Sequence, residues 1–147
     1  ISACEKEGQW EQALSLMEKM RRDGLLPVVI TYTAAISACG KGQQSAKALL
    51  LLQDMRQQGV VPNVITYSAA ISACEKEGQW EQALSLMEKM RRDGLLPVVI
   101  TYTAAISACG KGQQSAKALL LLQDMRQQGV VPNVITYSAA ISACEKE

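Results

Sequence analysis

The chain has 147 residues, of which 48% are hydrophobic and 20% are charged, and its 15 Lys and Arg nearly balance its 14 Asp and Glu. This composition is typical of a water-exposed helical protein, and no run of residues approaches the roughly 18 apolar positions that a membrane-spanning helix requires. The lack of histidine removes Ser-His and Cys-His nucleophiles and His-ligated zinc, and no G-x-x-x-x-G-K phosphate loop occurs, so we expect neither an enzyme nor a cofactor.

An internal repeat organises the whole sequence. Residues 1–77 match residues 71–147 without a difference, and a looser match at an offset of 35 residues shows that the repeat exists in two alternating versions. A period of this length is typical of solenoid proteins. The sequence therefore predicts a single repeat array over residues 1–147. Its parts are the partial repeat 1–28, the complete repeats 29–63, 64–98 and 99–133, and the partial repeat 134–147.

Each complete repeat is predicted to begin with a helix of small residues. In repeat 64–98 this helix starts with Asn63 or Thr66 as its cap and runs to about Lys76. Gly78 is expected to end it. In the other version of the repeat we assign the corresponding break to Gly40 and Gly42.

A second and more amphipathic helix follows in each repeat. In repeat 64–98 its apolar residues recur with the spacing of one helical face: Ala83, Leu84, Leu86, Met87 and Met90. This helix is predicted to end at Arg92 or Asp93, because Gly94 favours the left-handed conformation that follows a helix and Pro97 prevents its continuation.

A single repeat is not expected to fold alone. Its first helix carries little apolar volume, because its surface is formed by small residues: Ala69, Ala70, Ser72, Ala73 and Cys74. Burying a large apolar side chain contributes about 1.5–3 kcal/mol, whereas ordering the backbone costs about 1–2 kcal/mol for every residue. The repeats must therefore stack. The predicted fold class is an all-α α-solenoid, a right-handed superhelix of helix-turn-helix repeats with the first helices on its concave side.

The recurring motifs resemble those of the pentatricopeptide repeat family. V-I-T-Y opens the first helix, A-L-x-L-x-x-x-M lies in the second, and G-x-x-P-N closes a 35-residue repeat. Tetratricopeptide repeats share the helix-turn-helix plan, but they have 34 residues and a W-x-x-L-G-x-x-Y signature that this chain lacks. The resemblance covers the whole chain. It implies a protein of mitochondria or plastids that binds single-stranded RNA, although the chain itself contains no targeting segment.

The resemblance also implies which residues contact RNA, because such arrays bind one base per repeat. The second residue of each repeat contacts the faces of a base; these residues are Ile30, Ile65, Ile100 and Ile135. The fifth and the last residue form a reading pair that meets the edge of the base; the pairs are Thr33 with Asn63, Ser68 with Val98, and Thr103 with Asn133, while Ser138 has lost its partner.

The reading pairs imply a base preference. In the family a Thr-Asn pair favours adenine, and an Asn amide offers a base edge both a donor and an acceptor. Val98 offers neither, so repeat 64–98 is expected to read its base poorly. The inferred preference is adenine at repeats 29–63 and 99–133, with no preference between them.

Each of these positions also has an ordinary structural interpretation. An Asn after Pro is a common helix cap, an Ile at the head of a helix commonly packs against its neighbours, and a Thr or Ser one turn into a helix is unremarkable.

One lysine follows the cysteine of every repeat: Lys6, Lys41, Lys76, Lys111 and Lys146. In stacked repeats these lysines would lie in a row, and the resemblance places them near RNA phosphates. Glu75 and Glu77 flank Lys76 and lower its positive potential, whereas Lys41 and Lys111 are expected to stand alone. The alternative is a solvated lysine that interacts favourably with the C-terminal end of a helix.

The cysteines recur at the same spacing, at Cys4, Cys39, Cys74, Cys109 and Cys144. Equivalent residues of stacked repeats should lie beyond the roughly 7 Å Cα limit of a disulfide, so we expect small buried thiols and no metal site. Trp10 and Trp80 precede a second helix, where they are expected to fill the gap between helices rather than stack on bases.

A different functional class stays open, namely a structural or assembly module that packs on other proteins or on copies of itself. The near-neutral charge, the apolar Val98, and Leu50 and Leu120, which we expect on the outer face, favour it. The perfect 70-residue duplication adds an engineered periodic array as a third alternative. No membrane and no small-molecule substrate are expected as partners.

Overall fold

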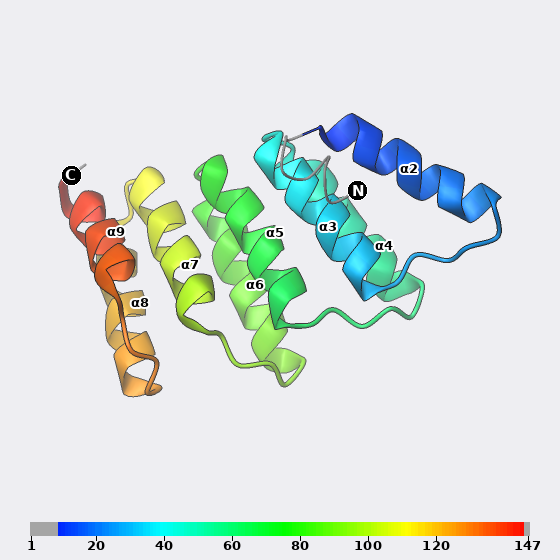
Figure 1. Cartoon of the computed structure of the whole chain (residues 1–147). Helices are drawn as coiled ribbons and strands as arrows, with labels where there is room; N and C mark the ends of the chain where they lie inside the picture. Colours follow the sequence, from blue (N-terminus) through cyan, green and yellow to red (C-terminus); the bar gives the residue numbers. More distant parts are fainter. Residues whose placement is uncertain (1–8, 146–147) are drawn as a thin grey trace. The chain divides into compact units, whose positions relative to one another are not determined.

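The described helices begin and end close to the residues expected from the sequence. The structure, a computed structural model, describes residues 9–145, and this range contains helices and no strands (Figure 1). The first helices of the repeats are α3 (Val29–Lys41), α5 (Val64–Lys76), α7 (Val99–Lys111) and α9 (Val134–Glu145). The second helices are α2 (Trp10–Arg22), α4 (Ser45–Gln57), α6 (Trp80–Arg92) and α8 (Ser115–Gln127). The fold is an all-α solenoid of helix-turn-helix repeats.

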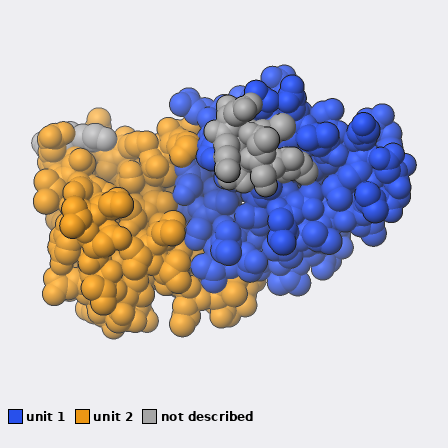
Figure 2. All heavy atoms as spheres, viewed as in Figure 1, with its two compact units in different colours: residues 1–73 blue, residues 74–147 orange. Residues whose placement is uncertain are grey.

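The chain divides into two compact units, residues 1–73 and residues 74–147, with the boundary inside α5 (Figure 2). In the first unit α3 packs against both α2 and α4, and in the second unit α7 packs against α6, α8 and α9. The tyrosines of α3, α5 and α7 enter the core, and Tyr32, Tyr67 and Tyr102 are almost completely buried, whereas Tyr137 on α9 is exposed.

The second helices end as predicted. Gly94 has a φ of +82°, and the backbone N–H of Leu95 donates a hydrogen bond of 2.9 Å to the carbonyl oxygen of Met90. This bond satisfies a carbonyl of the last helical turn, which is the usual reason for a left-handed residue at a helix end. Gly78 has a φ of +66° after α5 and plays the predicted part in ending that helix.

The break assigned to Gly40 is wrong, because α3 continues through Gly40 to Lys41. The left-handed residue that follows is Gln43, with a φ of 56°. Glycine at position 40 has another physical role: a Cβ there would lie 3.0 Å from the Cβ of Ala73 on α5. Gly110 approaches Ala143 in the same way, at 3.1 Å. Small residues therefore bring neighbouring first helices close together, as the sequence predicted.

Trp10 and Trp80 fill gaps between helices, as expected. A Cβ on Gly42 would lie 2.2 Å from Cδ1 of Trp10, so the indole occupies the space that a side chain would need. Trp80 covers Gly112 with the corresponding distance of 2.1 Å. Lys47 lies 5.3 Å from the centroid of the Trp10 ring, which is within the range of a cation–π contact.

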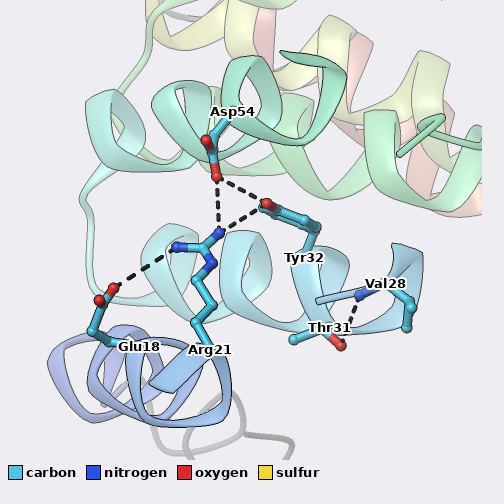
Figure 3. A network of polar contacts seen from close by, with 6 residues as sticks. All are labelled: Glu18, Arg21, Val28, Thr31, Tyr32 and Asp54. Atoms are coloured by element: carbon cyan, nitrogen blue, oxygen red, sulfur yellow. Dashed lines mark hydrogen bonds and ion pairs between the residues drawn. The ribbon is translucent and has the colours of Figure 1, made fainter. Parts of the chain in front are cut away.

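A cluster of Arg21, Tyr32 and Asp54 joins three helices of the first unit (Figure 3). Nη2 of Arg21 donates to the Tyr32 hydroxyl at 2.9 Å and to Oδ2 of Asp54 at 3.0 Å, and the Tyr32 hydroxyl donates to the same carboxylate at 2.9 Å. Burial, together with the hydrogen bond to Asp54, raises the pKa of Tyr32. The hydroxyl therefore stays protonated and keeps donating.

The second unit repeats this cluster with Arg91, Tyr102 and Asp124, at distances of 2.8 to 2.9 Å. Sequence reasoning did not identify the cluster. The sequence feature that could have indicated it is the difference between the two repeat versions at one position, where one version has Asp54 and the other has Lys89. An arginine and a tyrosine recur in every repeat, but only every second repeat supplies the carboxylate.

Candidate nucleic-acid interface

The second residue of each described first helix is an exposed isoleucine. The exposed fractions are 80% for Ile30, 68% for Ile65, 67% for Ile100 and 68% for Ile135. These side chains are therefore not part of the buried core. A large apolar side chain that is exposed at the same place in every repeat is available to contact a ligand.

The reading pair of repeat 29–63 is linked through a buried threonine of the next repeat. The hydroxyls of Thr33 and Thr66 are 2.9 Å apart, and Oγ1 of Thr66 donates to Oδ1 of Asn63, also at 2.9 Å. Thr66 is fully buried, whereas Thr33 is partly exposed and Asn63 is exposed. The structure thus brings together Thr33 and Asn63, which are 30 residues apart in the sequence.

The same arrangement recurs in the second unit. Thr103 and Thr136 are 2.8 Å apart, and Oγ1 of Thr136 donates to Oδ1 of Asn133 at 2.9 Å. Sequence reasoning singled out Thr66 only as a possible cap and did not connect it, or Thr136, with the reading pairs. A threonine recurs at the third position of each repeat, but the sequence does not show that it contacts both members of the preceding reading pair.

Asn63 and Asn133 are helix caps, which confirms the structural interpretation of these residues. Oδ1 of Asn63 accepts a hydrogen bond of 2.9 Å from the backbone N–H of Thr66, and Asn133 accepts the same bond from Thr136. Capping uses only the amide oxygen. Among the described residues, no side chain or backbone group accepts a hydrogen bond from the amide nitrogen of either Asn, so both nitrogens stay available for a ligand.

Val98 closes the middle repeat without a cap. Its backbone N–H donates to Oγ1 of Thr101 at 3.2 Å, but its side chain makes no cap hydrogen bond to α7. Its partner Ser68 is half-buried, and Ser138 on α9 is exposed. The middle reading pair therefore lacks the amide that the two outer pairs share.

The lysines do not all behave as predicted. Nζ of Lys111 forms an ion pair with the carboxylate of Glu75 on α5, so the expectation that Lys111 stands alone is wrong. The two residues are 36 positions apart in the sequence, so the acidic residue near the end of one first helix meets the lysine at the end of the next. Lys41 and Lys76 are exposed, and Lys41 also has an interaction partner. Lys6 and Lys146 lie outside the described residues.

Three of the cysteines are buried free thiols, as expected: Cys39, Cys74 and Cys109. Burial raises the pKa of Cys74 and of Cys109 to about 11. Cys144 is exposed, so the prediction of burial is wrong for this residue, and Cys4 lies outside the described residues. No group of His, Cys, Asp and Glu within residues 9–145 could hold a metal ion. None of the helices in this range has the length and apolar character needed to cross a membrane.

Family patterns match along the chain. The pattern of the pentatricopeptide repeat domain matches residues 50–112, that of the PPR repeat family matches residues 1–41 and 97–146, and that of the PPR repeat matches residues 30–60. No curated protein sequence matches the chain.

Solved structures of pentatricopeptide repeat proteins are similar. PPR10 in complex with an 18-nt psaJ RNA element superposes with a TM-score of 0.87 at 32% identity, and the match covers 98% of this chain and 21% of that chain. PPR10 from maize gives a TM-score of 0.67 at 25% identity, covering 97% and 25% of the two chains. The PPR domain of Arabidopsis thaliana protein-only RNase P 1 in complex with tRNA gives 0.82 at 21% identity, covering 97% and 76%, and this likeness concerns the fold alone. The chain thus spans about a fifth of PPR10.

Proposed function

We propose that this chain, which belongs to the pentatricopeptide repeat family, binds single-stranded RNA and reads one base per repeat. The observation that carries the proposal is the recurrence of an exposed isoleucine at the start of every described first helix, including those of the two repeats that contain Thr-Asn pairs. The similarity to PPR10, which is described in complex with an RNA element, supports RNA as the ligand. The role is binding, without a catalytic step.

Each repeat contributes three kinds of contact in this proposal. Ile30, Ile65, Ile100 and Ile135 lie against the faces of the bases. The reading pairs contact the edges, with adenine favoured at repeats 29–63 and 99–133. The lysine row, Lys6, Lys41, Lys76, Lys111 and Lys146, contacts phosphates. By family membership the protein works in a mitochondrion or a plastid.

The test uses fluorescence anisotropy with short RNA oligonucleotides that carry A or G at two positions separated by one base. The wild-type chain is expected to prefer A at both positions. The double variant Asn63→Asp and Asn133→Asp should move this preference toward G by roughly 1–3 kcal/mol per site, if base contacts in RNA resemble good bidentate contacts in DNA. Asp replaces the amide donor by a second acceptor, and the N1–H of guanine can donate to that acceptor.

The same variants provide a control for folding. Asp is as good a helix cap as Asn, so the backbone N–H groups of Thr66 and Thr136 keep an acceptor and thermal stability should change little. Equal affinity for A and G, both before and after the substitutions, would contradict base reading and leave Asn63 and Asn133 as caps alone.

A scaffold function is the alternative, and one observation favours it. Leu50 and Leu120 are each 63% exposed on the second helices, as the sequence predicted. An apolar residue at this position could contact another protein. Under this alternative, Leu50→Ser and Leu120→Ser would abolish the assembly while RNA affinity would be negligible throughout. Under RNA binding, the same two substitutions leave RNA affinity unchanged.

A further inference from the structure

We propose that Thr66 and Thr136 are positioning residues for the reading pairs Thr33–Asn63 and Thr103–Asn133. They fix which member of each pair donates a hydrogen bond to the base and which member accepts one. As a result, each pair recognises a base with an amino group. The inference rests on the proposed function, because the bases are contacted by those pairs. It assigns part of the selectivity of one repeat to the third residue of the next repeat. Neither threonine needs to contact RNA.

The direction of each hydrogen bond follows from the number of protons. The Thr66 hydroxyl has one proton, and it donates this proton to Oδ1 of Asn63 at 2.9 Å, because a carbonyl oxygen can only accept. The 2.9 Å contact between Thr66 and Thr33 must therefore use the Thr33 proton. Oγ1 of Thr66 accepts this bond, and it also accepts a 3.3 Å bond from the backbone N–H of Asn63.

The amide of Asn63 is oriented by the same contacts. Its oxygen accepts from both the backbone N–H and the hydroxyl of Thr66, each at 2.9 Å. Rotating the amide by half a turn would place its NH₂ group against the backbone N–H of Thr66, which can only donate, and would lose that bond. The full burial of Thr66 strengthens this preference, because an unpaired group in its place would not find water.

A ligand at this pair therefore meets one acceptor and one donor. The acceptor is the Thr33 oxygen, whose proton points into the protein, and the donor is the NH₂ group of Asn63. Adenine and cytosine present the complementary pattern on their pairing edges, an amino group beside an unprotonated ring nitrogen. Guanine and uracil present a carbonyl beside a ring N–H, which is the reverse. The pair thus selects amino bases, and the size of the base is left to other contacts.

The repeat that follows the middle reading pair offers a matched control. Thr101 is fully buried like Thr66, and it accepts the same kind of bond, 3.2 Å long, from the backbone N–H of Val98. Val98 has no amide to orient. Thr101→Val therefore removes a buried hydroxyl of the same kind without disturbing an Asn-containing pair.

The experiment measures affinity for three single-stranded RNA probes by fluorescence anisotropy. The probes are A-x-A, G-x-A and A-x-G with x held constant, and the proteins are wild type, Thr66→Val, Thr136→Val and Thr101→Val. Thr66→Val should reduce the preference for A over G about 3- to 10-fold at one of the two positions, as expected for the loss of one buried hydrogen bond. Thr136→Val should do so at the other position. Thr101→Val should change neither preference, and Thr66→Ser should restore the wild-type ratio.

The possible failures can be told apart. If the wild-type chain binds none of the probes, the proposed function fails and this inference fails with it. If the wild-type chain prefers A and both valine variants keep the wild-type ratio, only the inference is overturned. A loss of preference that is equal in Thr101→Val and Thr66→Val would also overturn it, because the effect would then be a general loss of structure.

Discussion

Val98→Asn should add both a helix cap and a third reading pair. Val98 has an extended backbone, with φ −112° and ψ −177°, and its side chain is 43% exposed, so an Asn there can reach the first turn of α7. By analogy with Asn63, its oxygen would accept from the backbone N–H and the hydroxyl of Thr101, which contributes about 2 kcal/mol. Loss of the half-buried valine offsets about 1 kcal/mol of this. The net gain of about 1 kcal/mol should raise Tm by about 2–4 °C.

Val28→Asn separates capping from base reading. Val28 has nearly the same backbone, with φ −116° and ψ −177°, and caps α3 without a side-chain hydrogen bond. The Val28→Asn variant should therefore show a similar rise in Tm. Residue 28 closes the partial repeat 1–28, which supplies no fifth-position residue among these 147, so no reading pair is completed.

Two assays decide the outcome. Tm is measured by circular dichroism, and base preference is measured by anisotropy with the probes A-A-A and A-G-A. Both variants should be more stable, but only Val98→Asn should discriminate between the probes at the middle base, by roughly 1–3 kcal/mol. If neither variant gains stability, the capping argument is refuted. If both gain stability and neither discriminates, Asn at this position is a cap and nothing more.

Three further predictions concern the charged and buried groups. Glu75→Gln should free Lys111 to contact a phosphate, so the slope of log affinity against log salt should become more negative by about 0.7. Glu81→Gln makes an equal charge change on an exposed residue of α6 and should leave this slope unchanged. Tyr102→Phe should lower the free energy of unfolding by about 1 kcal/mol in urea titrations, while the 2.8 Å Arg91–Asp124 pair remains. Tyr137→Phe should cost less, because the Tyr137 hydroxyl is exposed and accepts a 3.2 Å bond from Arg126; equal losses would argue against the cluster. Burial raises the pKa of Cys109 from its usual 9.0 to about 11, so the thiol of the unfolded chain loses its proton at a lower pH than the thiol of the folded chain. The free energy of unfolding should therefore fall as pH rises from about 9 to about 11. Cys109→Ala should weaken this pH dependence, and an unchanged profile of stability against pH would contradict the burial argument.

The sequence by itself determined the features that depend on the repeat and on residues close together along the chain. The 35-residue period follows from the match of the sequence with itself. The helix ends at Lys76 and Arg92, the left-handed glycines at 78 and 94, and the cap at Asn63 follow from backbone preferences within one helical turn. These preferences act locally, so they can be read without knowing how the repeats stack. The break predicted at Gly40 was wrong for the same reason. A glycine inside a helix resembles a local break, and only the packing against Ala73, where a Cβ on residue 40 would lie 3.0 Å from the Cβ of Ala73, explains it.

The tertiary structure decided which groups meet between repeats. Thr33 and Thr66 are 33 residues apart, and Lys111 and Glu75 are 36 residues apart, in each case on neighbouring first helices. A 35-residue period predicts that such residues lie near one another, but it does not set the rotation and axial shift of one helix against the next, and these decide whether two side chains are in hydrogen-bonding distance. The polarity of the reading pairs depends on that geometry, because the single proton of Thr66 can be assigned only when both of its neighbours are known.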